Sequence, residues 1–111
     1  MAIALLSAVG ANAITPAGPY TSYPGPPAGG YVDCHSCGRN LASLRLLVAG
    51  TFTAGNVIFE HSPDSGITWF PLGSGPVGTE IAVERPIDWV RARTDGAIAG
   101  GTASAFMEVS A

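Results

Sequence analysis

The residues whose types suit chemistry lie in two short stretches. The first holds both cysteines, in the run Cys34-His35-Ser36-Cys37, and the other histidine of the chain is His61. Zinc takes four such ligands, but a histidine between the cysteines is unlike the usual paired spacing, and a redox pair would need a βαβ context. We interpret this stretch as a tight turn with two thiols and expect no metal and no other cofactor. The sequence leaves open whether the cysteines are free, disulfide-bonded or metal-bound.

The second stretch places acidic and hydroxyl side chains around His61. Glu60 and Asp64 both carry carboxyl groups, as the catalytic pair of a glycosidase does; such a pair flanks the scissile bond. However, Glu60 and His61 are neighbours in a predicted strand and point to opposite faces, and Asp64 is expected to serve a turn. The sequence contains no phosphate-binding loop, paired-histidine metal motif or nucleophile elbow. We therefore expect that the protein is not an enzyme.

The turn is specified side chain by side chain. The Asp64 carboxylate can accept hydrogen bonds from nearby backbone N–H groups, and Gly66 can supply a positive φ. The spacing resembles the Asp box, a structural turn of sialidase propeller blades that lies away from the catalytic pocket. The matching residues are Ser62, Asp64, Gly66, Thr68 and Trp69. A propeller needs several four-stranded blades, so a single Asp box implies a structural hairpin and no sialidase activity.

The charge and hydropathy of the chain indicate which kinds of molecule it is expected to contact. The chain of 111 residues fits one domain. Its net charge is −3 and all five of its positive residues are arginines, which argues against a nucleic-acid partner. No apolar run approaches the roughly 18 residues of a membrane span. Charged residues make up only 12%, and the mean hydropathy is +0.32. Such a surface is expected to be covered by other protein subunits; the alternative is a tightly packed monomer rich in alanine and glycine.

The pattern of strands and turns predicts an all-β protein. Fifteen glycines and nine prolines separate short apolar runs, which is typical of many short strands. We predict an antiparallel β-sandwich, jelly-roll-like or Ig-like, of about seven or eight strands, with a closed barrel as the alternative. Residues 1–40 are assigned to an N-terminal strand and an extended Pro/Gly-rich arm, and residues 41–111 to the sandwich core. The core strands are predicted at 43–52, 57–60, 68–72, 79–84, 87–94 and 102–109, with a loop at 73–78.

The first strand and the faces of the later ones follow from the same pattern. Residues 1–13 are predicted as a strand, since a signal peptide ending at Ala13 would lack a positive N-terminal region. In the strand 87–94, Val90 and Ala92 share one face, whereas Arg91 and Arg93 continue the opposite face toward solvent or a partner carboxylate. Both faces of the strand 43–52 are largely apolar, which predicts a central position in its sheet.

The Pro/Gly-rich arm is predicted to dock on a partner. Residues 15–30 hold five prolines and four glycines, a composition that cannot sustain a helix or a sheet ladder. Tyr20, Tyr23 and Tyr31 can each bury a ring and keep the hydroxyl in water. We predict that these tyrosines anchor the arm on neighbouring subunits; the alternative is a flexible linker.

Residues 43–111 resemble the small virion proteins of tailed bacteriophages. The matching segments are 5–8 and 50–52, the hairpin segment 57–73, Trp89 to Ala92, and the last strand 101–109. The Pro-rich arm and the cysteine pair are not part of that pattern. The resemblance implies a non-enzymatic capsid decoration (cement) protein on the outer surface of the virion. It would bind the major capsid protein and neighbouring copies of itself, as a trimer or dimer. A neck, tail or fibre protein is the alternative within that class.

A different class of function is a carbohydrate-binding module. Such a module would use Trp69, Trp89 and tyrosines as stacking platforms, and it requires coplanar aromatic rings in solvent. We expect instead that Trp69 packs on the hairpin and that Trp89 lies in the core.

Overall fold

The computed structural model describes residues 2–14, 32–33, 43–63, 68–83 and 89–110. In these ranges the chain forms strands and turns, and no helix there is long and apolar enough to cross a membrane. The strands are β1 (Ala2–Val9), β2 (Val32–Asp33), β3 (Ser43–Gly50), β4 (Val57–Ser62), β5 (Phe70–Gly75), β6 (Glu80–Val83), β7 (Trp89–Thr94) and β8 (Ala103–Ser110).

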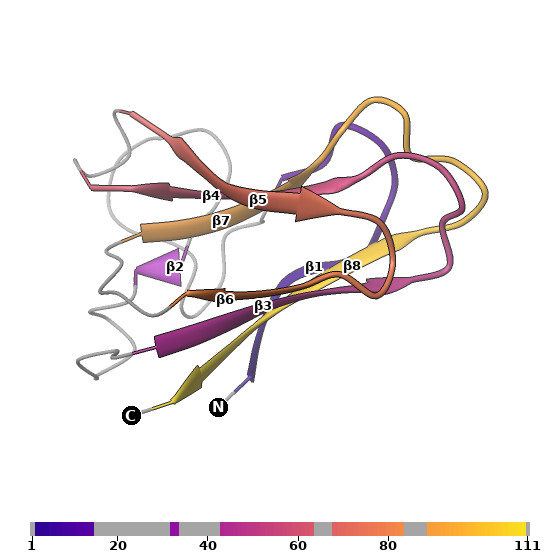
Figure 1. Cartoon of the computed structure of the whole chain (residues 1–111). Helices are drawn as coiled ribbons and strands as arrows, with labels where there is room; N and C mark the ends of the chain where they lie inside the picture. The colour runs from indigo at the N-terminus through magenta and orange to yellow at the C-terminus, as the bar shows by residue number, and fades with distance from the viewer. Residues whose placement is uncertain (1, 15–31, 34–42, 64–67, 84–88, 111) are drawn as a thin grey trace.

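The strands form two antiparallel sheets stacked as layers (Figure 1). Sheet A has the order β1-β8-β3-β6, and sheet B has the order β2-β7-β4-β5. The first strand therefore pairs with the eighth, the second with the seventh, the third with the sixth and the fourth with the fifth. This is a long antiparallel ribbon rolled up on itself, which is the jelly-roll topology. The predicted all-β sandwich is confirmed, and its topology is the jelly roll.

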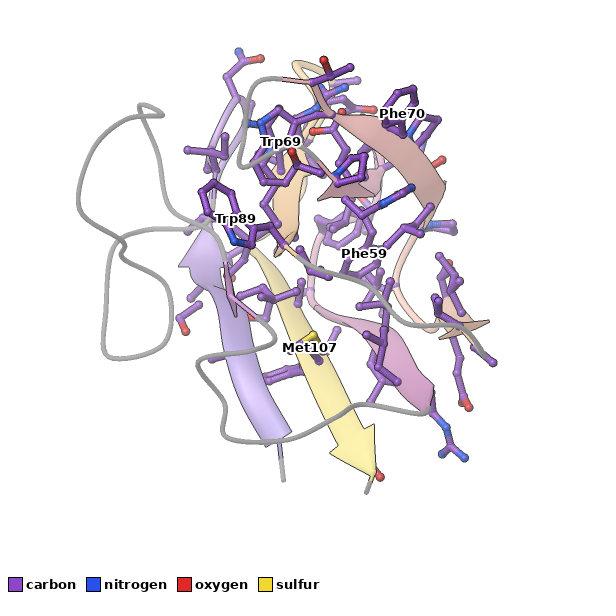
Figure 2. The ribbon with its side chains drawn as sticks, turned by 90° about the vertical axis from the view of Figure 1, so that its left-hand side faces the viewer. Phe59, Trp69, Phe70, Trp89 and Met107 are labelled. Atoms are coloured by element: carbon purple, nitrogen blue, oxygen red, sulfur yellow. The ribbon has the colours of Figure 1, made fainter. Side chains whose placement is uncertain are left out.

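The hydrophobic core lies between the two sheets. In sheet A, alternate residues of β3 and β8 point inward, including Leu46, Ala105 and Met107, all with no exposed surface. Sheet B contributes Phe59 and Val90, which are equally buried; Figure 2 shows Phe59 and Met107 between the layers. β3 lies between β8 and β6, so its predicted central position is confirmed. The period-two alternation predicted for these strands is what lets both sheets present one apolar face.

The N-terminal strand belongs to this core. β1 pairs with β8 along its length, and Leu5 and Leu6 are both buried in the core cluster. Two neighbouring residues can face the same way because the pairing with β8 shifts register between Ala4 and Leu6, as a β-bulge does. The core therefore includes residues before the predicted boundary at residue 40. The arm assigned to residues 15–30 falls outside the described residues.

β5 extends further than the sequence indicates. Residues 73–75 were predicted as part of a loop, but Gly73 pairs with Phe59, and Gly75 with Val57, in the hairpin with β4. A Cβ on Gly73 would lie 2.6 Å from Cδ1 of Ile81. Gly73 therefore leaves room for the side chain of Ile81, which lies in β6 of the other sheet. Glycine marks a close approach of a side chain to the backbone here, whereas the sequence pattern suggested the end of the strand.

The edge of sheet B beside β7 is an interrupted strand. Ile14 bridges to Arg93, and the backbone N–H of Thr94 donates to the carbonyl of Ala13. Val32 pairs with Val90 and Asp33 with Trp89, in the same direction. If the pairing that starts at Ile14 continued, residue 17 would face Val90. Val32 occupies that place, so 15 additional residues are inserted into this edge strand.

Candidate functional site

The predicted hairpin is formed by β4 and β5. These strands pair antiparallel from Val57 and Gly75 to His61 and Phe70. Ser62 is fully buried at the end of β4 and Thr68 is exposed, whereas Asp64 and Gly66 lie outside the described residues. β5 begins at Phe70, one residue after Trp69, although Thr68 and Trp69 were expected to start it. The turn chemistry of the motif therefore stays a prediction.

The other predicted site residues also fall outside the described ranges. These are Tyr20, Tyr23 and Tyr31 of the arm and the possible metal ligands Cys34, His35 and Cys37. Within the described part of the chain, no group of three or more His, Cys, Asp or Glu side chains could hold a metal ion. Zinc binding by the cysteine pair stays untested.

A charged cluster lies on the outer face of sheet B. We call it the Glu60 cluster; it consists of Glu60, Arg91, Arg93 and Trp69. Glu60 Oε1 accepts hydrogen bonds from Nε of Arg91 at 2.9 Å and from Nε of Arg93 at 3.0 Å. The Cζ atom of Arg91 lies 4.0 Å from the centroid of the Trp69 ring, a cation–π distance. Arg91 is thus held between a carboxylate and an aromatic face.

Strand register brings these residues together. Glu60 is directly opposite Arg91, and Ile58 is directly opposite Arg93. Residues two positions apart on one strand share a face, so Arg91 and Arg93 both point to the side of Glu60, opposite to Val90 and Ala92. The pairing of β4 with β5 shifts register between Phe59 and Glu60. The hairpin then brings Trp69, just before β5, over Arg91.

The burial of the cluster indicates a structural role. The Glu60 side chain is 11% exposed and that of Arg91 is 15% exposed, whereas Arg93 reaches solvent with 40%. A buried carboxylate is tolerated when charged donors satisfy it. The Oε1 atom of Glu60 is shared by the two guanidinium groups of Arg91 and Arg93. The cluster fastens the hairpin to β7.

The two tryptophans have separate environments. Trp89 is 7% exposed, so it is buried as predicted, but it does not belong to the core cluster between the sheets. It is directly opposite Ser62 and lies on the same face of β7 as Arg91. Trp69 is half-buried and stacks on Arg91, in agreement with the prediction that it packs on the hairpin. On the same hairpin, the ring of Phe70 lies 5.8 Å from that of His61 and is exposed. The described geometry thus gives both tryptophans contacts within the protein.

The outer face of sheet A carries a second group of side chains. Arg45 and Leu47 of β3 alternate with core residues and therefore point outward, as do Phe106 and Glu108 of β8. Leu47 is directly opposite Phe106, and Arg45 is directly opposite Glu108. We call these four residues, with Ala4, Ala49, Glu80, Ala82 and Ser104 around them, the sheet A face. The largely apolar character of both faces of the strand 43–52 predicted its central position in the sheet, and it also accounts for Leu47 on this outer face.

The fold and the site define a jelly-roll β-sandwich with a partly buried ion cluster on one outer face and a mixed apolar and charged patch on the other. No protein-family model matches the chain, and no curated protein matches it in sequence. A solved structure that does match is described as "Crystal structure of SPBc2 prophage-derived protein YomS". The match has a TM-score of 0.63 and 9% identity, and it covers 99% of this chain and 92% of that chain. The two proteins share the fold over almost their whole lengths.

Proposed function

We propose that this protein is a non-enzymatic structural subunit of a bacteriophage particle. In its most specific form, the proposal is a decoration (cement) protein on the outer surface of the capsid, which binds the major capsid protein and neighbouring copies of itself. The observation that carries the proposal is the match in fold, over almost the full length of both chains, to a prophage-derived protein.

Two further observations support a structural subunit. Charged residues make up only 12% of the chain, so much of its surface suits contact with protein rather than water. The buried carboxylate of the described residues, Glu60, is occupied by structural ion pairs. A repeated lattice also multiplies weak contacts, so each subunit needs only modest patches.

The test is the place and number of this chain in particles of the phage that encodes it. We expect its density on the outside of the head in a particle reconstruction and hundreds of copies in a stained gel of purified virions. A few tens of copies or fewer would favour the neck, tail or fibre alternative. Absence from purified particles would refute the virion proposal in both forms.

A carbohydrate-binding module is the second candidate, favoured by the exposed Phe70 next to His61. It is weakened by the burial of Trp89 and by the stacking of Trp69 on Arg91, because a sugar needs a free ring face. Binding on a glycan array together with a change in tryptophan fluorescence would favour it over the virion proposal. No binding and unchanged fluorescence would remove it.

The role of the arm can be tested without disturbing the sandwich. Since 15 residues are inserted between Ile14 and Val32, deleting residues 16–30 should join the two halves of the edge strand in register. We expect this variant to fold, with its free energy of unfolding within about 1 kcal/mol of wild type, and to bind shells lacking this protein much more weakly in co-sedimentation. Wild-type occupancy of shells by the folded variant would show that the arm is a passive linker.

A matched control for this deletion removes one residue fewer. Deleting residues 16–29 should leave Val32 and Asp33 one position out of register with β7. We expect this control to be less stable than the variant lacking residues 16–30 in thermal unfolding. Equal stability would show that the two halves of the edge strand are not in the register that the pairing indicates.

A further inference from the structure

The sheet A face has the features of a surface that pairs with a copy of itself. Ala4, Arg45, Ala82 and Glu108 are exposed, so the described part of the chain does not cover this side of the sheet. At its centre are the half-buried Leu47 and Phe106, which are cross-strand neighbours. In Figure 1, sheet A forms the lower layer, with this face directed away from sheet B.

The order of charges across the face makes it self-complementary. Consider a two-fold axis that runs parallel to the strands, midway between β3 and β8. Because Arg45 and Glu108 are directly opposite in the register, this axis places Arg45 of each copy over Glu108 of the other. In the same way it places Leu47 of each copy over Phe106 of the other. A closed, isologous contact of this kind needs no other partner.

We propose that this protein forms a two-fold dimer through the sheet A face, with Leu47 and Phe106 at its centre and reciprocal Arg45–Glu108 ion pairs beside them. The proposal deepens the proposed function, since it names the surface for self-association. The role of the dimer on a shell rests on the proposed function. Dimerisation itself does not, because it can be measured with the purified protein.

The size of the face predicts a weak dimer. β1, β3 and β8 have eight residues each and β6 has four. With strands spaced about 4.8 Å apart and about 3.3 Å per residue, the face measures at most roughly 19 by 26 Å. That is on the order of 500 Å², less than the roughly 800 Å² per partner of a standard stable interface. The dimer should therefore dissociate in dilute solution and become important where copies are held close together, as on a shell.

The test uses two charge-reversed variants, Arg45→Glu and Glu108→Arg. Each alone puts like charges opposite one another across the two-fold axis, so we expect self-association at least about tenfold weaker than that of wild type. An equimolar mixture of the two variants restores both ion pairs in the heterodimer, and we expect it to associate about as well as wild type. Analytical ultracentrifugation from about 10 μM to about 1 mM covers the weak end of affinities.

The mixture of variants distinguishes a loss of contacts between two copies from a folding defect within each variant chain. Arg45 also lies 3.2 Å from Glu80 of its own chain, so a change in folding alone would affect each variant whether or not the other is present. Circular dichroism checks that both variants fold. If either does not, Leu47→Asp replaces it, with Val77→Asp as the control, because Val77 is exposed in the turn between β5 and β6. We expect the first of these to abolish association and the second to leave it unchanged.

Three results would overturn the proposal. They are a wild-type protein that stays monomeric at about 1 mM, single variants that associate as wild type does, and a mixture of folded variants that does not associate. Any of them would leave the virion role standing, since that role is measured by the presence of the chain in particles. Conversely, absence from particles would leave the dimer in solution unaffected.

Discussion

The ion pairs on the outer faces of the two sheets differ in burial. On sheet B, Glu60 is bound by two arginines, and Trp69 covers one of them. On sheet A, Arg45 and Glu80 form an ion pair whose side chains are both 54% exposed. A buried ion pair must be satisfied within the protein because desolvation is costly, whereas an exposed one contributes little to folding. The carboxylate of the first face is therefore bound within the protein, whereas the charges of the second are in contact with solvent.

Of the variants that compare the two faces, the one without the buried carboxylate of Glu60 should lose the most free energy of unfolding. Glu60→Ala leaves Arg91 half-buried without its charge partner, and we expect a loss of about 3 kcal/mol in the free energy of unfolding. Chemical denaturation measures it. Glu60→Gln keeps the shape and one acceptor oxygen and should lose less. A loss below about 0.5 kcal/mol for Glu60→Ala, the range of an exposed pair, would show that the two faces do not differ.

A smaller effect is expected from uncovering Arg91. Trp69→Ala removes the aromatic face that lies 4.0 Å from the guanidinium, and we expect a loss of about 1–2 kcal/mol from the cation–π contact and the packing. Phe70→Ala is the matched control, since Phe70 is the next residue and is exposed. Thermal unfolding should rank wild type and Phe70→Ala together, above Trp69→Ala. The reverse order would contradict the role assigned to Trp69.

The smallest effect is expected on sheet A. Glu80→Ala removes the exposed partner of Arg45, and the free energy of unfolding should change by less than about 0.5 kcal/mol. The measurement is the same denaturation curve as for Glu60→Ala, so the two variants compare the faces directly. A loss as large as that of Glu60→Ala would show that this ion pair is also part of what holds the sandwich together.

Local patterns in the sequence were enough to predict most of the strands. Period-two alternation put Val90 and Ala92 of β7 on one face, and both lie in the core. The same alternation put Arg91 and Arg93 on one face, opposite to Val90. Alternation is reliable for this strand because one of its faces is buried and a slip of one residue would expose it.

Other elements depended on contacts that no local pattern contains. β2 has two residues and exists because Val32 and Asp33 meet β7. Gly73 and Gly75 looked like a loop, yet they pair with β4. The insertion between Ile14 and Val32 is visible only because both ends lie on β7. Each of these features is set by pairing between residues far apart in the chain.

The sequence by itself determined that this protein is an all-β sandwich with a hairpin formed by β4 and β5, because strand propensity, alternation and turn residues act over a few positions. Only the tertiary structure decided that the sandwich is a jelly roll. It also decided which side chains meet: Glu60 was considered with Asp64 as a catalytic pair, but register placed it against Arg91. Register is fixed by the fit of whole sheets around a common core, so it follows from the complete fold and not from any single segment.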